Sequence, residues 1–312
     1  MSDPWRILFM GTSEFAVPAL KAIHQAGYSI VLVVTQPDRP AGRGMELKAS
    51  PVKKSALELG LQVFQPEKVR FPEAVETLKK AAPDVTIVAA YGQILPSSVL
   101  QIPKAASLNI HGSLLPKYRG AAPIHYAVMN GEKETGVTIM LMNEKMDEGD
   151  MILAKNTTIG EAETTGEVHD RLAQLGAEGV LEALQLLGQG KAPRISQDHS
   201  QATYAPSLKR EQCRIDWGKA ARQIVNQVRG LSPWPVAETA WQGMEIKVHQ
   251  ARVENRNGKP GGILAVEKDG VVVGAGTEAV RLLEIQPPGK KKMNAHDFTL
   301  GHPDFKPGAT LS

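Results

Sequence analysis

Short apolar segments alternate with helical segments through roughly the first 190 residues, and this alternation most strongly limits the fold. Buried strands are predicted at residues 6–10, 30–35 and 85–90, with helices at residues 15–26 and 51–59 between them. Alternating strands and helices are typical of right-handed βαβ crossovers and a parallel sheet. We therefore expect an α/β fold in which a Rossmann-like, mostly parallel sheet is flanked by helices.

The pattern changes after a long predicted helix at residues 165–187. A polar connection follows, and short strands separated by glycines are then predicted, among them residues 263–266, 271–273 and 280–285. Short strands separated by glycines indicate a small β-rich barrel or sandwich, and we expect a C-terminal β-barrel of the OB-like type. We expect a first domain over residues 1–189, a linker over 190–208 and the barrel over 209–312. Three tryptophans are expected in the barrel core rather than stacked on bases, namely Trp217, Trp234 and Trp241.

Composition restricts the location and the partners. Cys213 is the one cysteine of the chain, which excludes an intramolecular disulfide and favours a reducing compartment. No apolar run approaches the roughly 18 residues that span a bilayer, so we expect a cytoplasmic protein without a membrane partner. From residue 205 onward there are 16 Lys and Arg against 11 Asp and Glu, whereas the rest carries 20 against 22. This asymmetry indicates either a polyanionic partner or chance variation.

The segment at residues 107–123 begins as an apolar strand and continues into a loop rich in glycine and proline. Side chains alternate along a strand, so Asn109 and His111 share one face while Leu108 and Ile110 occupy the other. Ligands of open α/β sheets bind at the carboxyl ends of the strands. The sequence therefore predicts a chemical site here, although a single histidine is more often structural.

A second loop, at residues 143–149, offers the acidic candidates Glu144, Asp147 and Glu148. A carboxylate fixes the tautomer of a neighbouring imidazole, and an amide donates to a developing oxyanion. Amide, imidazole and carboxylate together suit acyl transfer through a tetrahedral intermediate. The dinucleotide pattern G-x-G-x-x-G, the hydrolase pattern G-x-S-x-G and the metal patterns of paired cysteines or H-E-x-x-H do not occur in the sequence.

Residues 109–116 (NIHGSLLP) and 119–124 (RGAAPI) resemble the signature of the folate-dependent formyltransferases, as do residues 135–140 and Asp147. The resemblance implies 10-formyltetrahydrofolate as co-substrate, no metal, and catalysis by Asn109, His111 and Asp147. It also implies that the loop before Asp147 and two further segments line the folate pocket. The residues of these two segments are Ala89, Ala90, Tyr91, Gly92, Ser113, Leu114, Leu115 and Pro116.

Residues 36–44 (QPDRPAGRG), 214–217, 232–235 and 287–291 resemble the branch of this family that acts on methionyl-tRNA. This implies formyl transfer to the α-amine of methionyl-initiator tRNA for translation initiation. Nothing in the sequence suggests an obligate interface, so we expect a monomer. Contacts with tRNA are then expected from the basic residues Arg39, Arg43, Lys48, Lys209 and Arg210, although a solvated surface loop is the alternative interpretation of residues 36–44. Two other functions stay open: a formyltransferase that acts on a UDP-amino-sugar, and a tRNA- or folate-binding protein without turnover.

Overall fold

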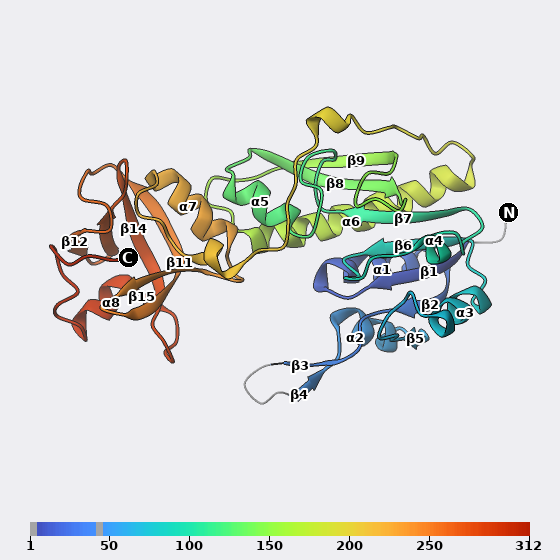
Figure 1. Ribbon diagram of the computed structural model, residues 1–312, viewed down its shortest axis with the longest axis horizontal. Helices are drawn as coiled ribbons and strands as arrows, with labels where there is room; N and C mark the ends of the chain where they lie inside the picture. The colour runs from blue at the N-terminus through green and yellow to red at the C-terminus, as the bar shows by residue number, and fades with distance from the viewer. Residues whose placement is uncertain (1–4, 42–45) are drawn as a thin grey trace. The chain divides into compact units, whose positions relative to one another are not determined.

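A computed structural model of the chain describes residues 5–41 and 46–312 (Figure 1). The described residues divide into two compact units. The first unit contains the described residues up to Gly120 together with Thr135–Thr157 and His169–Tyr204. The second unit contains Ala121–Glu134, Thr158–Val168 and Ala205–Ser312. Within residues 5–41 and 46–312, no helix is both long enough and apolar enough to cross a membrane.

The first unit is organised around a seven-stranded sheet with the order β5-β2-β1-β6-β7-β8-β9. Pairing is parallel from β5 to β7, and β8 then pairs antiparallel with β7. The expected parallel-dominated sheet is therefore confirmed. The strands are β1 (Arg6–Gly11), β2 (Ser29–Val34), β5 (Val63–Phe64), β6 (Val85–Ala89), β7 (Ala106–His111), β8 (Glu134–Leu141) and β9 (Met151–Thr158).

Helices flank this sheet, which explains why its central strands are apolar on both faces. All five residues of β6 are buried, as are residues 7–11 of β1. The hydroxyl of Ser50 accepts a hydrogen bond from the Lys53 amide and so caps the second helix, as a serine before a helix favours. The helical segments are η1 (Glu14–Ala16), α1 (Val17–Gln25), α2 (Pro51–Glu58), α3 (Pro72–Lys80), α4 (Ser97–Leu100) and α6 (Thr165–Gly188).

Gly136 in β8 allows the backbone of β9 to approach closely. A Cβ atom at this position would lie 2.2 Å from the carbonyl oxygen of Lys155 and 2.5 Å from Leu114 Cδ2. We expect Gly136→Ala to lower the free energy of unfolding by about 3 kcal/mol, because backbone must move to admit the methyl group. Urea unfolding measures this. The control is Gly188→Ala, where the nearest atom is 3.5 Å away. Equal midpoints for the two variants would contradict the argument.

The second unit contains an antiparallel sheet with the order β10-β11-β14-β13-β12, to which β15 adds beside β14. Helix α7 carries Ile224, Val225 and Val228 on one face and packs against α5 and β11. The strands are β10 (Ala237–Trp241), β11 (Met244–Glu254), β12 (Ile263–Glu267), β13 (Gly270–Gly274), β14 (Ala279–Gln286) and β15 (Met293–Asn294). The helical segments are α5 (Pro123–Met129), η3 (Arg210–Cys213), α7 (Ala221–Gly230) and α8 (Ala295–Leu300).

The predicted barrel is not closed. Within the described residues, β10 and β12 end the hydrogen-bonded path and do not pair with each other. The C-terminal segment occupies the gap: Ser312 exchanges backbone hydrogen bonds with Ala240 of β10, and Leu311 donates to the carbonyl oxygen of Gly261 next to β12. This short irregular segment provides hydrogen-bond partners at the edges of β10 and β12, so the two strands do not need to pair with each other.

The prediction that Trp234 lies in the core is wrong. Trp217 and Trp241 are buried in the core of the second unit, as expected. Trp234, in contrast, is 68% exposed and makes an edge-on contact with the ring of His125. It lies in the turn at residues 231–235, between α7 and β10, where no strand alternation directs a side chain inward.

Candidate active site

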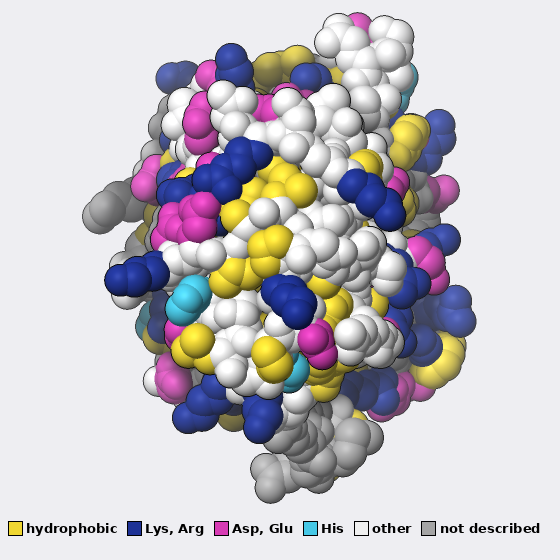
Figure 2. Space-filling view, turned by 90° about the vertical axis from the view of Figure 1, so that its left-hand side faces the viewer, with side chains coloured by type: hydrophobic (Ala, Val, Ile, Leu, Met, Phe, Trp, Pro, Cys, Tyr) yellow, Lys and Arg dark blue, Asp and Glu magenta, His cyan; other side chains and the backbone are white. Residues whose placement is uncertain are grey.

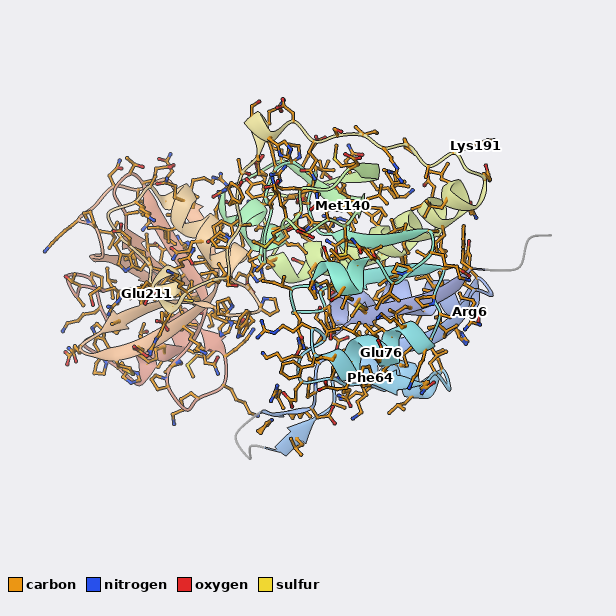
Figure 3. The ribbon with its side chains drawn as sticks, turned by 45° about the vertical axis from the view of Figure 1, so that its right-hand side comes forward. Arg6, Phe64, Glu76, Met140, Lys191 and Glu211 are labelled. Atoms are coloured by element: carbon orange, nitrogen blue, oxygen red, sulfur yellow. The ribbon has the colours of Figure 1, made fainter. Side chains whose placement is uncertain are left out.

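Three of the predicted catalytic side chains meet at the carboxyl end of β7. Asn109 and His111 belong to β7, where Asn109 pairs with Met140 of β8 and His111 with Thr138. Met140 is labelled in Figure 3, which marks this part of β8. The loop that follows β8 carries Asp147 back to the end of β7, so a hairpin brings residues 38 positions apart into contact. This geometry places an amide, an imidazole and a carboxylate together.

Asp147 joins the other two groups. Its Oδ1 lies 3.4 Å from Asn109 Nδ2, which donates to it, and 3.6 Å from His111 Nδ1. Its Oδ2 accepts a 2.8 Å hydrogen bond from the backbone N–H of Gly120. His111 is buried and the Asp147 side chain is only 13% exposed, so little water screens the pair. The carboxylate therefore fixes the relative orientation of the amide and the ring.

Both nitrogens of the His111 ring face oxygen atoms. Nε2 lies 3.0 Å from the carbonyl oxygen of Tyr118, and Nδ1 faces the Asp147 carboxylate. A neutral imidazole has one N–H donor, whereas a doubly protonated ring has two. Because a carbonyl oxygen only accepts, Nε2–H is the donor to Tyr118, and the Asp147 carboxylate lies beside Nδ1.

The sequence analysis did not predict two buried residues that lie near Asp147. Arg119 is 1% exposed, and Gln197 is 6% exposed in the segment predicted as a linker. A charged residue between two glycine- and proline-rich stretches is the signal that could have identified Arg119. No local pattern distinguishes Gln197, because its importance depends on the return of residues 195–204 to this site.

The two predicted folate segments leave adjacent strand ends. Val88 of β6 pairs with Asn109 of β7, so residues 89–92 and 113–116 both leave the same edge of the sheet. Ala90 and Gly92 are exposed, while Ala89 and Tyr91 are buried. Burial raises the pKa of the Tyr91 hydroxyl to about 12.

The segment at residues 113–116 is held by its own hydrogen bonds. Ser113 and Leu115 are buried, and Leu114 and Pro116 are partly buried. The Ser113 hydroxyl donates to the carbonyl oxygen of Lys117, and the Leu115 amide donates to Thr138 Oγ1. These contacts fix the shape of the loop beside Asn109 and His111.

The predicted tRNA residues of the first unit lie on a two-stranded ribbon formed by β3 (Arg39–Ala41) and β4 (Glu46–Lys48). Arg39 pairs with Lys48 in register, and the Arg39 guanidinium also forms an exposed ion pair with Glu67. At the base of the ribbon, a hydrogen bond from Lys53 holds the pKa of Asp38 below its ordinary value. Arg43 lies outside the described residues.

In the second unit, Lys209 and Arg210 are exposed, and Arg210 pairs with Glu245 at 3.1 Å. Figure 2 shows one face of the molecule, on which Lys and Arg side chains are scattered among Asp and Glu instead of forming one patch. No group of three His, Cys, Asp or Glu side chains able to hold a metal ion occurs in residues 5–41 and 46–312.

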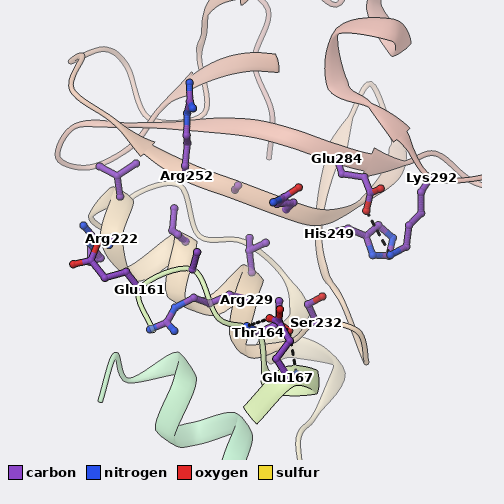
Figure 4. A pocket seen from close by; sticks show the side chains of 16 residues that line it. Glu161, Thr164, Glu167, Arg222, Arg229, Ser232, His249, Arg252, Glu284 and Lys292 are labelled. Carbon is purple, nitrogen blue, oxygen red and sulfur yellow. Dashed lines mark hydrogen bonds and ion pairs between the residues drawn. The ribbon is translucent and has the colours of Figure 1, made fainter. Parts of the chain in front are cut away.

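The second unit also contains a cavity of about 620 Å³ between α7 and β11 (Figure 4). Val225 and Val228 contribute apolar surface to it, and burial lowers the pKa of His249 in its wall. Four basic and three acidic side chains line it: Arg222, Arg229, Arg252, Lys292, Glu161, Glu167 and Glu284. Arg222 and Lys292 are exposed and could contact phosphate groups.

Comparisons with known proteins agree with this architecture. The family described as formyl transferase matches residues 5–184, and the formyl transferase C-terminal domain matches residues 207–303. The structure of HypX from Aquifex aeolicus in complex with tetrahydrofolic acid has a TM-score of 0.63 and 20% identity, and the match covers 95% of this chain and 47% of that one. At this identity the likeness shows the fold.

Two curated relatives carry the comparison further. The methionyl-tRNA formyltransferase of Pelotomaculum thermopropionicum is 48% identical, over 96% of this chain and 96% of its own length. That of Geobacter sulfurreducens is 46% identical, over 98% of this chain and 96% of its own length. The formyl transferase match over residues 5–184 includes Asn109, His111 and Asp147. The chain is an enzyme that belongs to the methionyl-tRNA formyltransferase family.

Proposed function

We propose that this enzyme transfers the formyl group of 10-formyltetrahydrofolate to the α-amine of methionyl-initiator tRNA, with Asn109, His111 and Asp147 as its catalytic residues. The observation that carries the proposal is the meeting of the Asn109 amide and the His111 ring at one oxygen of Asp147. Family membership supplies the substrates, because the curated relatives bear the name methionyl-tRNA formyltransferase. A tetrahydrofolate complex in a protein of this fold supports the co-substrate.

The reaction begins when the amine nitrogen attacks the formyl carbon. A carbon–nitrogen bond forms, and the carbonyl electron pair moves to oxygen to give an oxyanion. Asn109 Nδ2 donates to this oxyanion in exchange for its long contact with Asp147, and the charged His111 ring stabilises it further. The amine proton passes to the Asp147–His111 pair. The oxyanion electron pair then re-forms the carbonyl as the bond from carbon to the folate nitrogen N10 breaks. N10 takes up the proton, which restores the pair.

Asp147 serves three purposes in this scheme. It balances the charge on His111, limits the rotation of the Asn109 amide, and provides an oxygen that can accept the amine proton. Its second oxygen stays bound to the Gly120 amide throughout, so the carboxylate does not need to reorient between steps. Groups that are already oriented stabilise developing charge without further reorganisation.

A formyl-transfer assay with methionyl-tRNA and 10-formyltetrahydrofolate tests the proposal, using the wild type and His111→Ala. We expect transfer by the wild type and loss of transfer in the variant. If the enzyme formylates a UDP-amino-sugar and not methionyl-tRNA, the proposed acceptor substrate is wrong. Binding of both substrates without any turnover would reject catalysis. Full activity of His111→Ala would overturn the assigned roles while leaving the reaction intact.

The domain assignment belongs to the same proposal. Residues 1–189 carry catalysis, and residues 209–312 bind tRNA through Lys209, Arg210 and neighbouring cations. Residues 190–208 connect the two and also bring Gln197 to the catalytic site. Arg39, Arg43 and Lys48 contact the tRNA from the first unit. The enzyme acts as a monomer in the cytoplasm. Exposed basic side chains on both units support these contacts, because phosphate contacts position a nucleic acid without reading its bases.

We expect the KM for methionyl-tRNA to rise steeply with potassium chloride, while the KM for 10-formyltetrahydrofolate changes little. Each phosphate contact releases a condensed counterion, so the logarithm of affinity falls linearly with the logarithm of salt. Steady-state kinetics between about 50 and 200 mM salt measure both constants, over which range several contacts cost on the order of 1,000-fold in affinity. A KM for tRNA that is independent of salt would refute the electrostatic contacts.

A further inference from the structure

The loop that carries Asp147 is held by a side chain from a distant segment of the chain. Asp147 adopts a positive φ of 55°, in the left-handed region that residues with a Cβ atom seldom occupy. The Gln197 side-chain amide donates 2.8 Å hydrogen bonds to the carbonyl oxygens of Asp147 and Gly149. One side chain thereby fixes the backbone on both sides of Glu148, which preserves the turn that aims Asp147 toward Asn109 and His111.

Gln197 is itself oriented by the buried guanidinium of Arg119. Its Oε1 accepts from Arg119 Nη2 at 2.7 Å and from Nε at 3.2 Å. The remaining Arg119 nitrogen, Nη1, lies 3.4 Å from the Glu148 carboxylate. The Gln197 side-chain oxygen faces the Arg119 donors, and the Gln197 NH₂ group faces the two backbone carbonyl oxygens. A single orientation of the side-chain amide therefore makes all of these hydrogen bonds.

Residues 195–204 also contact the segment that supports His111. The Tyr118 amide donates to Thr203 Oγ1, and the Arg119 amide donates to the Thr203 carbonyl oxygen. The carbonyl oxygen of Tyr118 is the partner of His111 Nε2. Residues 195–204 therefore support both members of the Asp147–His111 pair. Within this segment, Gln197 makes the contact with the backbone of Asp147.

We propose that Gln197 is a positioning residue for formyl transfer, acting through Asp147. Oriented by Arg119, it keeps the Asp147 carboxylate within reach of Asn109 and His111 and does not touch substrate. This inference rests on the proposed function, because it matters only if Asp147 takes part in the reaction.

Two substitutions separate the two halves of the Gln197 amide. Gln197→Met removes its acceptor and its donors, whereas Gln197→Glu keeps an acceptor for Arg119 and removes the donors to Asp147 and Gly149. We expect both to lower kcat by about 10- to 100-fold, since small misplacements of a reacting group cost this much. KM for both substrates should change less than about threefold, because binding surfaces stay in place. The control is Gln189→Met, at an exposed glutamine directly after α6 and outside residues 195–204.

A double-mutant cycle distinguishes positioning from a purely structural role. Gln197→Met is measured in the wild type and in Asp147→Asn by single-turnover kinetics. If Gln197 acts through Asp147, its loss costs less than about twofold in the second background, because coupled residues are not additive. An equal cost in both backgrounds would show a structural role and overturn the proposal. Wild-type kcat in Gln197→Glu would also overturn it, whereas an inactive wild type would instead overturn the proposed function.

Discussion

Replacing Asn109 with alanine is expected to lower kcat about 100- to 1,000-fold, the usual cost of removing one donor to an oxyanion. Asn109 lies on β7 with its Nδ2 3.4 Å from Asp147 Oδ1, a long hydrogen bond that can be exchanged for one to the substrate. Because this new bond strengthens as negative charge develops, its loss affects the transition state more than the bound substrate.

The kinetic signature of Asn109→Ala should be a reduced kcat with a nearly unchanged KM for both substrates. Steady-state formyl transfer measures both constants, and folate binding by fluorescence checks that the pocket is intact. Asn257→Ala is the matched control, because Asn257 is exposed in the second unit and its side chain accepts from the Glu278 amide, away from the catalytic residues. Near-normal kcat in Asn109→Ala would reject the oxyanion role.

Asp147→Asn is expected to lower kcat by roughly 1,000-fold, because a neutral amide cannot balance a charged imidazole in a buried site. The new amide can donate to His111 Nδ1, which leaves the ring neutral while its Nε2–H still donates to the Tyr118 carbonyl oxygen. The size and shape of residue 147 are conserved, and its oxygen can still accept from Gly120. The lower kcat of Asp147→Asn would therefore reflect the loss of the negative charge and of proton transfer, and not a change in the structure of the loop.

Asp170→Asn is the control for this substitution. Asp170 also contacts a histidine, with its Oδ1 3.0 Å from His169 Nδ1, but its side chain is 85% exposed. Solvent screening makes such a surface pair weak, so we expect kcat within about twofold of the wild type. If Asp147→Asn retains most of its activity under the same conditions, Asp147 neither charges His111 nor receives the amine proton.

Local sequence patterns predicted the elements that follow a simple period. Buried apolar runs identified β1, β2 and β6, and strand alternation placed Asn109 and His111 on one face of β7. The structure agrees, since both side chains reach the same oxygen of Asp147. These inferences succeeded because the 2.0-residue period of a strand depends only on the backbone and survives any tertiary arrangement.

Other features depended on residues distant in sequence. The exposure of Trp234 follows from a turn between α7 and β10, and the gap between β10 and β12 follows from the position of the C-terminal residues. Local sequence, through residue type and the spacing of short strands, predicted a buried Trp234 and a barrel. It carries no information on where a turn places its side chains or on which segment covers a strand edge.

The sequence by itself determined the fold class, the two-part organisation and the face of β7 on which chemistry could occur, because each depends on local periodicity. The tertiary structure decided which groups complete that face. Asp147 arrives through the β8–β9 hairpin, and Gln197 arrives from a segment whose composition indicates only a connection. Contacts across 38 and 50 residues result from packing of the whole unit, which no local pattern records.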